Sequence, residues 1–512
     1  MKRVILLISI SAFLLNACKK QLTQVAPQDA ITNQAALSDT SAAQSLYVGV
    51  YNRFRSENSN LFFFGEMRSD IWCDGITQEA PGATYVQYSD QQISALNVPS
   101  NSTNWGGFYN VLYQINNVIQ IFPQTKLSDF TRNRDLADMY GLRAYIYYVM
   151  LRTWGDVPLV TKPITSVGDL SSLYQARTPA DSVMLQIKSD INQSLTLYNG
   201  NNALPAGRVY WSRLATLTLQ GDVYLWSGTQ MNGGTADFTT AMTALQQVEA
   251  LAGGKLGLQP NYADIFDPTK KTTEIENIFA IDYELSQAQN TNFTDFSVNN
   301  TQATSLVINP TTNPTLVSVA YPYIAGASRA GLTQTLINQL TGAPADQRIS
   351  GSITLMYGNT PPNYTVKGVM LTKWIGRVNA GAQLFDNNFP IYRYADVLLL
   401  MAEAKAKLGM DPSVEINQIR ARAYGASYPV YTNGSPDDNL KAILGEYLRE
   451  FIGEGKRWWA LRRAGDQYVY DYINPNYLSA ATAASGKGPT LLMPLSITDL
   501  NSNPLLVQTP GY

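Results

Sequence analysis

Residues 389–404 read FPIYRYADVLLLMAEA and continue as KAKLGMDP over residues 405–412. From Tyr394 onward, apolar side chains recur at intervals of three and four residues, which places them on one face of a helix. The members of this stripe are Tyr394, Val397, Leu398, Met401 and Leu408. Gly409 and Pro412 are typical of a helix end and a new helix start. The stretch therefore predicts a helix pair over 392–408 and 413–424.

The same helical spacing occurs in other parts of the chain. A continuous apolar stripe on a helix is by default the face that packs into a core. Such stripes cover residues 139–153, 208–228 and 438–463. Helices are also predicted over 44–55, 104–122, 178–197, 236–252 and 330–340.

A second helix pair is predicted around the Gly233-Gly234 turn, which separates 208–228 from 236–252. The latter segment has the small–large spacing of the second helix of a tetratricopeptide unit. The residues in this pattern are Phe238, Ala241, Leu245 and Val248. No strict repeat length is present, so any repeats are degenerate.

Two long segments interrupt the helical pattern. Residues 60–103 and 255–390 are rich in Asn, Thr, Gly, Pro and Tyr, which indicates loops with short strands. Loops on a rigid scaffold commonly carry binding groups. The sequence therefore predicts a mainly α-helical protein in which tetratricopeptide-like helix pairs pack against an irregular, loop-rich, ligand-binding half.

Composition narrows the possible functions. The 512 residues include 37 basic and 39 acidic side chains, so the chain lacks the positive excess of nucleic-acid-binding proteins. The chain contains no histidine, which excludes Ser-His-Asp or Cys-His catalysis and His-ligated zinc. The 31 tyrosines suit sugar rings or peptide side chains, although core packing with a solvated hydroxyl accounts for most of them. No calcium-loop spacing occurs, so neither a metal nor a cofactor is predicted.

The N-terminus predicts export and lipidation. Lys2 and Arg3 precede an apolar run over 4–15, and small residues lead into Cys18, which is the order of a lipoprotein signal. We interpret residues 1–17 as the signal peptide and residues 18–40 as a polar, lipid-anchored tether. A plain secretory signal is the alternative interpretation.

The remainder, residues 41–512, is predicted to form one domain with the two loop-rich insertions. No later apolar run approaches the roughly 20 residues of a membrane span. If Cys18 carries a lipid, Cys73 has no intramolecular disulfide partner, because these are the only two cysteines.

Five blocks of sequence then occur in order along the chain. They are GLRAY with LRTWGDVPL (141–159), FPIYRYADVLLLMAEA (389–404), INQIRARA (416–423), LRE, GEGKRWW and LRR (448–463), and LMPL, NPL and QTPGY (492–512). Together with the lipoprotein signal, they closely resemble the SusD/RagB family of Bacteroidetes nutrient-binding outer-membrane lipoproteins. The resemblance covers essentially the whole mature chain.

The resemblance implies a SusD-like α–α superhelix that binds ligand and is not an enzyme. It also implies a lipid anchor in the outer membrane, exposure at the cell surface, and a SusC-like TonB-dependent transporter as partner. Surface export in these bacteria often follows acidic residues next to the lipidated cysteine, whereas Lys19 and Lys20 follow here. This departure bears on the outward orientation and not on lipidation.

Most residues of the matched motifs are predicted to be structural. Arg143, Arg152 and Asp156 are expected to pair with each other or to bond backbone carbonyls near a helix end. The Trp458-Trp459 pair is expected in the core.

Charges of alternating sign follow in the same C-terminal region. Glu450, Glu454, Arg457 and Arg462 are expected on one solvated or salt-bridged helix face. An acid–base pair of Glu450 and Glu454, as in a glycosidase, is the alternative.

Ligand-contacting residues are not fixed by the family motifs, because in this family they come from variable loops in the first third and the middle of the chain. We chose candidates by chemistry, since a sugar site combines aromatic platforms with planar polar groups. The candidates are Asp70, Trp72, Asp74, Tyr85, Tyr88, Asn104, Trp105, Tyr321, Tyr323, Arg348 and Trp374. For each of them, ordinary loop packing is the alternative.

The sequence thus favours a cell-surface lipoprotein that binds a glycan or oligosaccharide and delivers it to the transporter. A peptide-binding, RagB-like protein of the same architecture is the first alternative. A helical glycoside hydrolase that uses Asp70 and Asp74, or Glu450 and Glu454, is the second. A pure helical-repeat adaptor is the third, but it would not need the long aromatic loops.

Overall fold

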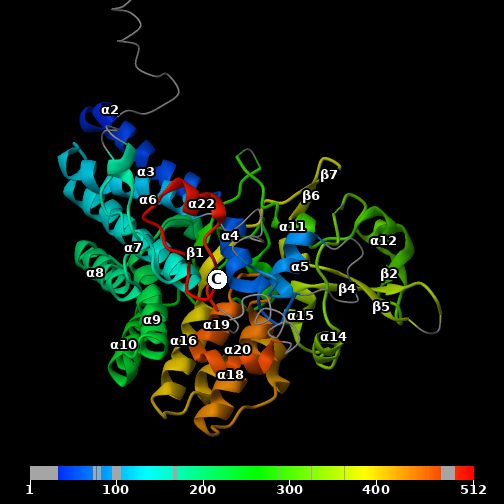
Figure 1. Cartoon of the computed structure of the whole chain (residues 1–512). Coiled ribbons are helices and arrows are strands. Elements are labelled where there is room, and N and C mark those ends of the chain that lie inside the picture. The colour runs from blue at the N-terminus through cyan, green and yellow to red at the C-terminus, as the bar shows by residue number, and fades with distance from the viewer. Residues whose placement is uncertain are drawn as a thin grey trace, which may run out of the picture.

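The computed structural model describes residues 33–72, 77, 82–94, 105–164, 170–285, 287–324, 326–361, 364–473 and 491–512. In this part of the chain, helices dominate and the strands are short, which confirms the predicted mainly helical fold. Figure 1 shows helices α6 to α10 on one side, helices α16 to α20 below, strands β2, β4, β5, β6 and β7 on the opposite side, and β1 near the centre.

The helical scaffold comes from two stretches of the chain. Its first stretch holds α2 (Asn33–Ser38), α3 (Thr40–Arg55), α6 (Gly106–Ile121), α7 (Asp129–Trp154), α8 (Ala180–Tyr198), α9 (Arg213–Gln230) and α10 (Gly234–Ala252). Its second stretch holds α16 (Tyr394–Lys407), α17 (Ser413–Tyr424), α18 (Pro436–Glu450), α19 (Arg457–Ala464), α20 (Asp466–Tyr472) and α22 (Ile497–Ser502).

The region between these stretches is irregular, as predicted. Its strands are β1 (Asn277–Ile281), β2 (Leu306–Ile308), β3 (Thr315–Leu316), β4 (Thr354–Gly358), β5 (Val366–Met370), β6 (Arg377–Asn379), β7 (Ala382–Leu384) and β8 (Phe389–Arg393). Its short helices are α11 (Asn292–Asp295), α12 (Asn300–Ser305), α13 (Val317–Ala320), α14 (Gln334–Thr341) and α15 (Gln347–Ser352). The strands form an antiparallel β3-β2-β4-β5 sheet and two antiparallel pairs, β1-β8 and β6-β7.

The earlier loop region also contains regular structure. It includes α4 (Asn58–Phe62), a single π-helical turn η1 (Phe63–Met67) and α5 (Ala83–Ser89). The last residues of the predicted tether are likewise ordered, because α2 spans 33–38 and Asn33 exchanges side-chain hydrogen bonds with Asn117 of α6.

The α9–α10 pair explains the small–large pattern found in the sequence. The ring of Phe238 on α10 lies against Gly228 of α9, and Leu245 lies against Gly221. A Cβ atom at Gly228 or Gly221 would stand 2.4 Å or 2.6 Å from these side chains. The two glycines therefore let the helices approach closely, as in a tetratricopeptide unit.

One predicted helix is wrong in extent. The stripe over 438–463 belongs to two helices, α18 and α19, which are separated by residues 451–456. Gly453 and Gly455 in this break have φ values of 83° and 70°. Left-handed backbone conformations interrupt a helix, and glycine adopts them without a steric penalty. The sequence predicted one continuous helix because apolar residues keep their helical spacing across residues 451–456.

None of the helices in the described residues is long and apolar enough to cross a lipid bilayer.

Replacing Gly49 with alanine is expected to stabilise the protein by about 0.5–1 kcal/mol. Gly49 lies inside α3, and a Cβ atom there would meet nothing within 4 Å. Alanine loses less backbone entropy than glycine when a helix forms, so the free energy of unfolding should rise. Urea denaturation of the two proteins measures the change, and a loss of stability would contradict the open environment.

Candidate functional site

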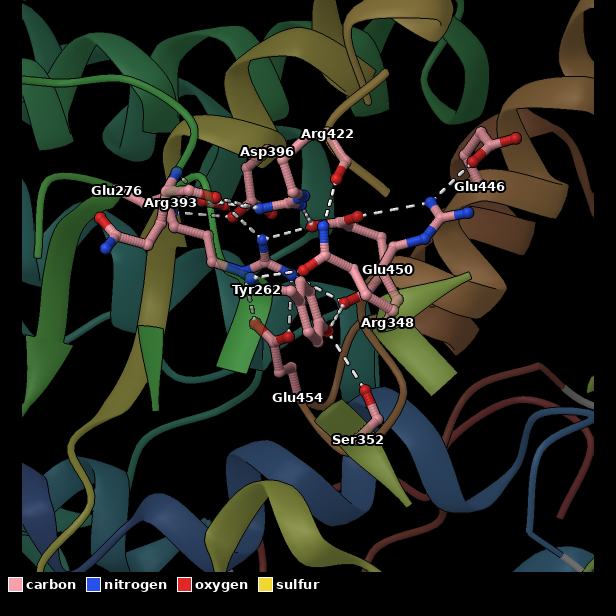
Figure 2. A network of polar contacts seen from close by, with 12 residues as sticks. Tyr262, Glu276, Arg348, Ser352, Arg393, Asp396, Arg422, Glu446, Glu450 and Glu454 are labelled. Atoms are coloured by element: carbon pink, nitrogen blue, oxygen red, sulfur yellow. Dashed lines mark hydrogen bonds and ion pairs between the residues drawn. The ribbon is translucent and has the colours of Figure 1, made fainter. Parts of the chain in front are cut away.

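The family motifs meet in a buried network of ion pairs, shown in Figure 2. Guanidinium nitrogens of Arg393 lie 2.5 Å from a carboxylate oxygen of Glu276, 2.7 Å from one of Glu450 and 2.9 Å from one of Glu454. Arg422 of α17 also pairs with Glu276 and Glu450. The network joins the residue before β1, the end of β8, α17 and the end of α18, so these motif residues tie the irregular region to the scaffold.

This network decides between the two interpretations of Glu450 and Glu454. Burial alone would raise the pKa of Glu450, but three arginines outweigh it and hold that pKa well below the ordinary value. At Glu454, Arg393 and two lysines outweigh burial and lower the pKa to about 2. A general acid needs a raised pKa, so the geometry argues against acid–base use of the pair.

The expectation of a solvated helix face is wrong. All four residues are buried; Glu450 ends α18, Glu454 lies in the break, and Arg457 and Arg462 belong to α19, so they do not share one helix. The salt-bridged alternative is confirmed. Trp458 and Trp459 are also buried, as predicted.

The earlier motif has a structural role too. Arg143 lies inside α7, away from the helix end, and pairs with Asp190 of α8 at 2.7 Å. Gly155, with a φ of 74°, ends α7, and Asp156 accepts a hydrogen bond from the backbone N–H of Ala180 at the start of α8. Arg143 and Asp156 thus fix how α8 packs on α7.

Several predicted ligand residues lie in the core. Trp72, Tyr88, Arg348 and Trp374 have no exposed surface or almost none. Trp72 donates its indole N–H to Glu66 at 2.7 Å, and Arg348 pairs with Asp346, Glu446 and Glu450. Buried side chains offer no surface to a ligand. Internal packing and pairing therefore explain these four residues, which was the alternative stated for each of them.

Two further candidates also have internal partners. Trp105 is 7% exposed and packs edge-on against Trp154, with ring centroids 5.8 Å apart. Asp70 forms an ion pair with Arg457 at 2.7 Å and lies in a groove of about 360 Å³. The groove is lined by Ser69, Asp70, Ser89, Thr333, Thr335, Leu336, Gln339, Leu448, Asp471, Tyr472 and Ile473. Asp74, Asn104 and the predicted lipidation site Cys18 lie outside the described residues.

The two loop regions that the sequence singled out lie against each other. Leu332 donates its backbone N–H to the hydroxyl of Thr77 at 2.8 Å, and Gly82 donates its own to the carbonyl of Arg329 at 3.3 Å. The hydroxyl of Tyr85 donates a hydrogen bond to Asp295. These contacts join α5 and the residues just before it to α11 and to the loop that follows α13, and α5 and α11 are neighbours in Figure 1.

An exposed polar and aromatic surface lies along this junction. We define the α5–α11 face by Tyr85, Asp295 and Arg329, which contact one another in turn, and we include Tyr321 and Tyr323 because they precede Arg329 in the same loop. Tyr323 is 48% exposed, Tyr321 is half-buried, and Tyr85 is almost buried. Backbone bonds from residues 326–329 to residues 294–298 hold the tyrosine-bearing loop against α11.

A charged pair on this face was not singled out in the sequence. Arg329 lies 3.4 Å from Asp295, and both side chains are about two-fifths exposed, at 44% and 40%. A partly solvated carboxylate and guanidinium can bond paired hydroxyl groups, and an exposed tyrosine ring such as Tyr323 of the same loop can pack against C–H groups. The only local signal was their position within a loop already predicted to bind.

Two observations bear on the chemistry of the described part of this face. Burial and the hydrogen bond to Asp295 raise the pKa of Tyr85 well above its ordinary range, so this phenol stays protonated. Among the described residues, no group of three or more His, Cys, Asp or Glu side chains is placed to hold a metal ion.

Comparisons with known proteins place the chain in a family. The profile described as "SusD family" matches residues 338–512, and the profile described as "Starch-binding associating with outer membrane" matches residues 24–208. The chain is 26% identical to SusD-like protein P38 of Formosa agariphila, over 99% of this chain and 98% of that protein.

Solved structures agree over nearly the full length. The structure called B. fragilis NanU is 33% identical, with a TM-score of 0.82 over 95% of this chain and 100% of that one. A SusD superfamily protein from Bacteroides vulgatus is 30% identical, with a TM-score of 0.79 over 93% of this chain and 99% of that one. The chain therefore belongs to the SusD superfamily, as its motifs predicted.

Proposed function

We propose that this protein is a binding protein for glycans or oligosaccharides at the outer membrane. The observation that carries this proposal is the full-length similarity to the SusD superfamily, together with the profile described as starch-binding and associating with the outer membrane. The mixed aromatic and polar character of the α5–α11 face supports it. A ligand held by an exposed surface dissociates readily, which suits a protein that passes its ligand on.

Isothermal titration calorimetry against a panel of oligosaccharides and against a peptide mixture tests the ligand class. We expect heat from at least one oligosaccharide. Heat from peptides alone would reject the glycan proposal in favour of the RagB-like alternative.

Replacing Tyr323 with alanine is expected to weaken oligosaccharide binding by about 1 kcal/mol, or roughly fivefold, if its exposed ring packs on the ligand. Titration calorimetry gives the affinity. Tyr113 on α6 is the matched control, because it is 46% exposed against 48% for Tyr323. If the Tyr323→Ala and Tyr113→Ala variants bind the oligosaccharide with equal affinity, Tyr323 is not part of the binding site.

We further propose that Cys18 carries the lipid anchor and that a SusC-like TonB-dependent transporter receives the ligand. Family membership supports both statements. Mass spectrometry of the membrane-extracted protein should show an acylated N-terminal Cys18, and an unmodified N-terminus would reject the anchor. Affinity purification from outer membranes should recover a TonB-dependent barrel protein, and its absence from gentle detergent extracts would reject the partner.

We propose that the protein has no hydrolytic activity. The low pKa values of Glu450 and Glu454 and the pairing of Asp70 with Arg457 support this. Incubation with polysaccharide should release no new reducing ends. Sustained release that disappears in an Asp70→Asn variant would establish an enzyme instead.

A further inference from the structure

The groove beside Asp70 shares no residue with the α5–α11 face. Its volume is about 360 Å³, which falls within the range of pockets that hold small ligands. Part of its lining comes from α14, and another part comes from Asp70 and the last residues of α20. Leu336, Leu448 and Ile473 add a buried apolar part. The lining therefore combines apolar surface with a small number of polar side chains.

The carboxylate of Asp70 is held in one orientation. Arg457 is 1% exposed, and it donates Nε to Oδ1 at 2.7 Å and Nη2 to Oδ2 at 2.8 Å. This two-pronged pairing fixes the plane of the carboxylate. A carboxylate has about four acceptor positions, so about two of them remain. The side chain of Asp70 is 16% exposed and lines the groove, so those positions can accept hydrogen bonds from a ligand.

Tyr472 supplies an aromatic ring next to this carboxylate. The guanidinium carbon of Arg457 lies 4.9 Å from the centroid of the ring, so the same buried cation positions both Asp70 and Tyr472. Tyr472 is half-buried and lines the groove. Such a ring can pack against the C–H groups of a sugar while the carboxylate bonds the hydroxyl groups.

The helix α14 contributes two exposed polar side chains to the lining, Thr335 and Gln339. They stand four residues apart, so they lie on the same face of the helix. Within the described part of the chain, neither side chain has a hydrogen-bond partner. Both are therefore available to a ligand, and the amide of Gln339 can both donate and accept.

The described part of the lining offers no cation to a ligand. Its charged residues are Asp70 and Asp471, and Asp70 is already paired with Arg457. Asp471 is exposed and accepts a hydrogen bond from Gln467. A ligand carboxylate or phosphate would meet no counter-charge here, whereas hydroxyl groups can donate to Asp70. The lining thus favours an uncharged ligand that is rich in hydroxyl groups.

We propose that this groove binds an uncharged sugar unit of an oligosaccharide. Asp70, Thr335 and Gln339 are its hydrogen-bond partners, and Tyr472 is the ring that packs on it. The inference rests on the proposed function, to which it adds a defined site and the charge of the ligand.

Isothermal titration calorimetry on the intact protein tests the site. The probes are a panel of uncharged oligosaccharides, uronic-acid oligosaccharides of equal length, and a peptide mixture. Gln339→Ala removes an exposed side chain, so the variant should fold. We expect it to weaken binding of an uncharged oligosaccharide about fivefold, the size of one lost hydrogen bond. Thr335→Trp places a bulky ring in the groove and should abolish that binding.

Gln334 is the matched control position, because it is exposed on the same helix and is not one of the lining residues. Gln334→Ala and Gln334→Trp should bind as the wild type does. If Gln339→Ala and Thr335→Trp bind an uncharged oligosaccharide as tightly as these controls, the groove is not the site, while the proposed function stands.

Two other results would also overturn the inference. If Thr335→Trp loses the binding of a uronic-acid oligosaccharide or of peptides but keeps that of the uncharged ligand, the ligand class of the groove is wrong. If no oligosaccharide binds the wild type, the proposed function and the groove site fail together.

Discussion

Replacing Arg393 with methionine is expected to destabilise the folded protein by about 3–5 kcal/mol. Arg393 is fully buried and provides the shared cation for Glu276, Glu450 and Glu454. Methionine has a similar length but no charge, so the variant would leave carboxylates buried with too few partners. That loss, rather than lost packing, sets the size of the effect. Urea denaturation followed by circular dichroism measures it.

Two variants separate this explanation from a general sensitivity to lost arginines. Arg132→Met removes the partner of Asp129, whose side chain is 85% exposed, and should cost no more than about 1 kcal/mol. Arg393→Lys keeps the charge but loses the guanidinium fork, so its stability should lie between wild type and Arg393→Met. Equal stabilities of the Arg393→Met and Arg132→Met variants would show that the network contributes little.

Local sequence was sufficient to predict the scaffold. The stripes over 139–153 and 208–228 became α7 and α9, and the glycine-separated pairs became α9–α10 and α16–α17. These predictions succeed because the side chains of one helix face are set by spacing along the chain. The break between α18 and α19 was missed because the apolar stripe runs across it.

The candidate site was less predictable, since it depends on contacts between distant segments. Trp72 has the composition of a sugar platform, but Glu66 and Phe296 enclose it. In contrast, Asp295 and Arg329 belong to no sequence motif. They become a pair only because residues 326–329 pack against residues 294–298 in the folded chain. Periodicity reports the face of an element, but it does not report which remote loop covers a given side chain.

Replacing Gly65 with alanine is expected to destabilise the protein by at least about 3 kcal/mol. Gly65 lies in the π-helical turn η1, and a Cβ atom there would stand 1.6 Å from the carbonyl oxygen of Gly455. That oxygen belongs to backbone, so it has no rotamer by which to move aside. The neighbouring Glu66 fixes the approach, because it accepts the backbone N–H groups of Gly453 and Gly455 at 2.6 Å and 2.8 Å.

Gly49→Ala is the matched control, since it makes the same chemical change in a helix with open space around it. The two variants should shift the urea midpoint in opposite directions, Gly65→Ala downward and Gly49→Ala slightly upward. A Cβ atom at Gly65 would also stand 2.8 Å from the indole nitrogen of Trp459. The Gly65→Ala variant should therefore push η1 away from the break before α19 and expose tryptophan residues near this contact, including Trp459, to solvent. A red shift of tryptophan fluorescence in the native buffer would report this opening. An unshifted spectrum with wild-type stability would show that the two backbone segments do not touch as closely as the structure places them.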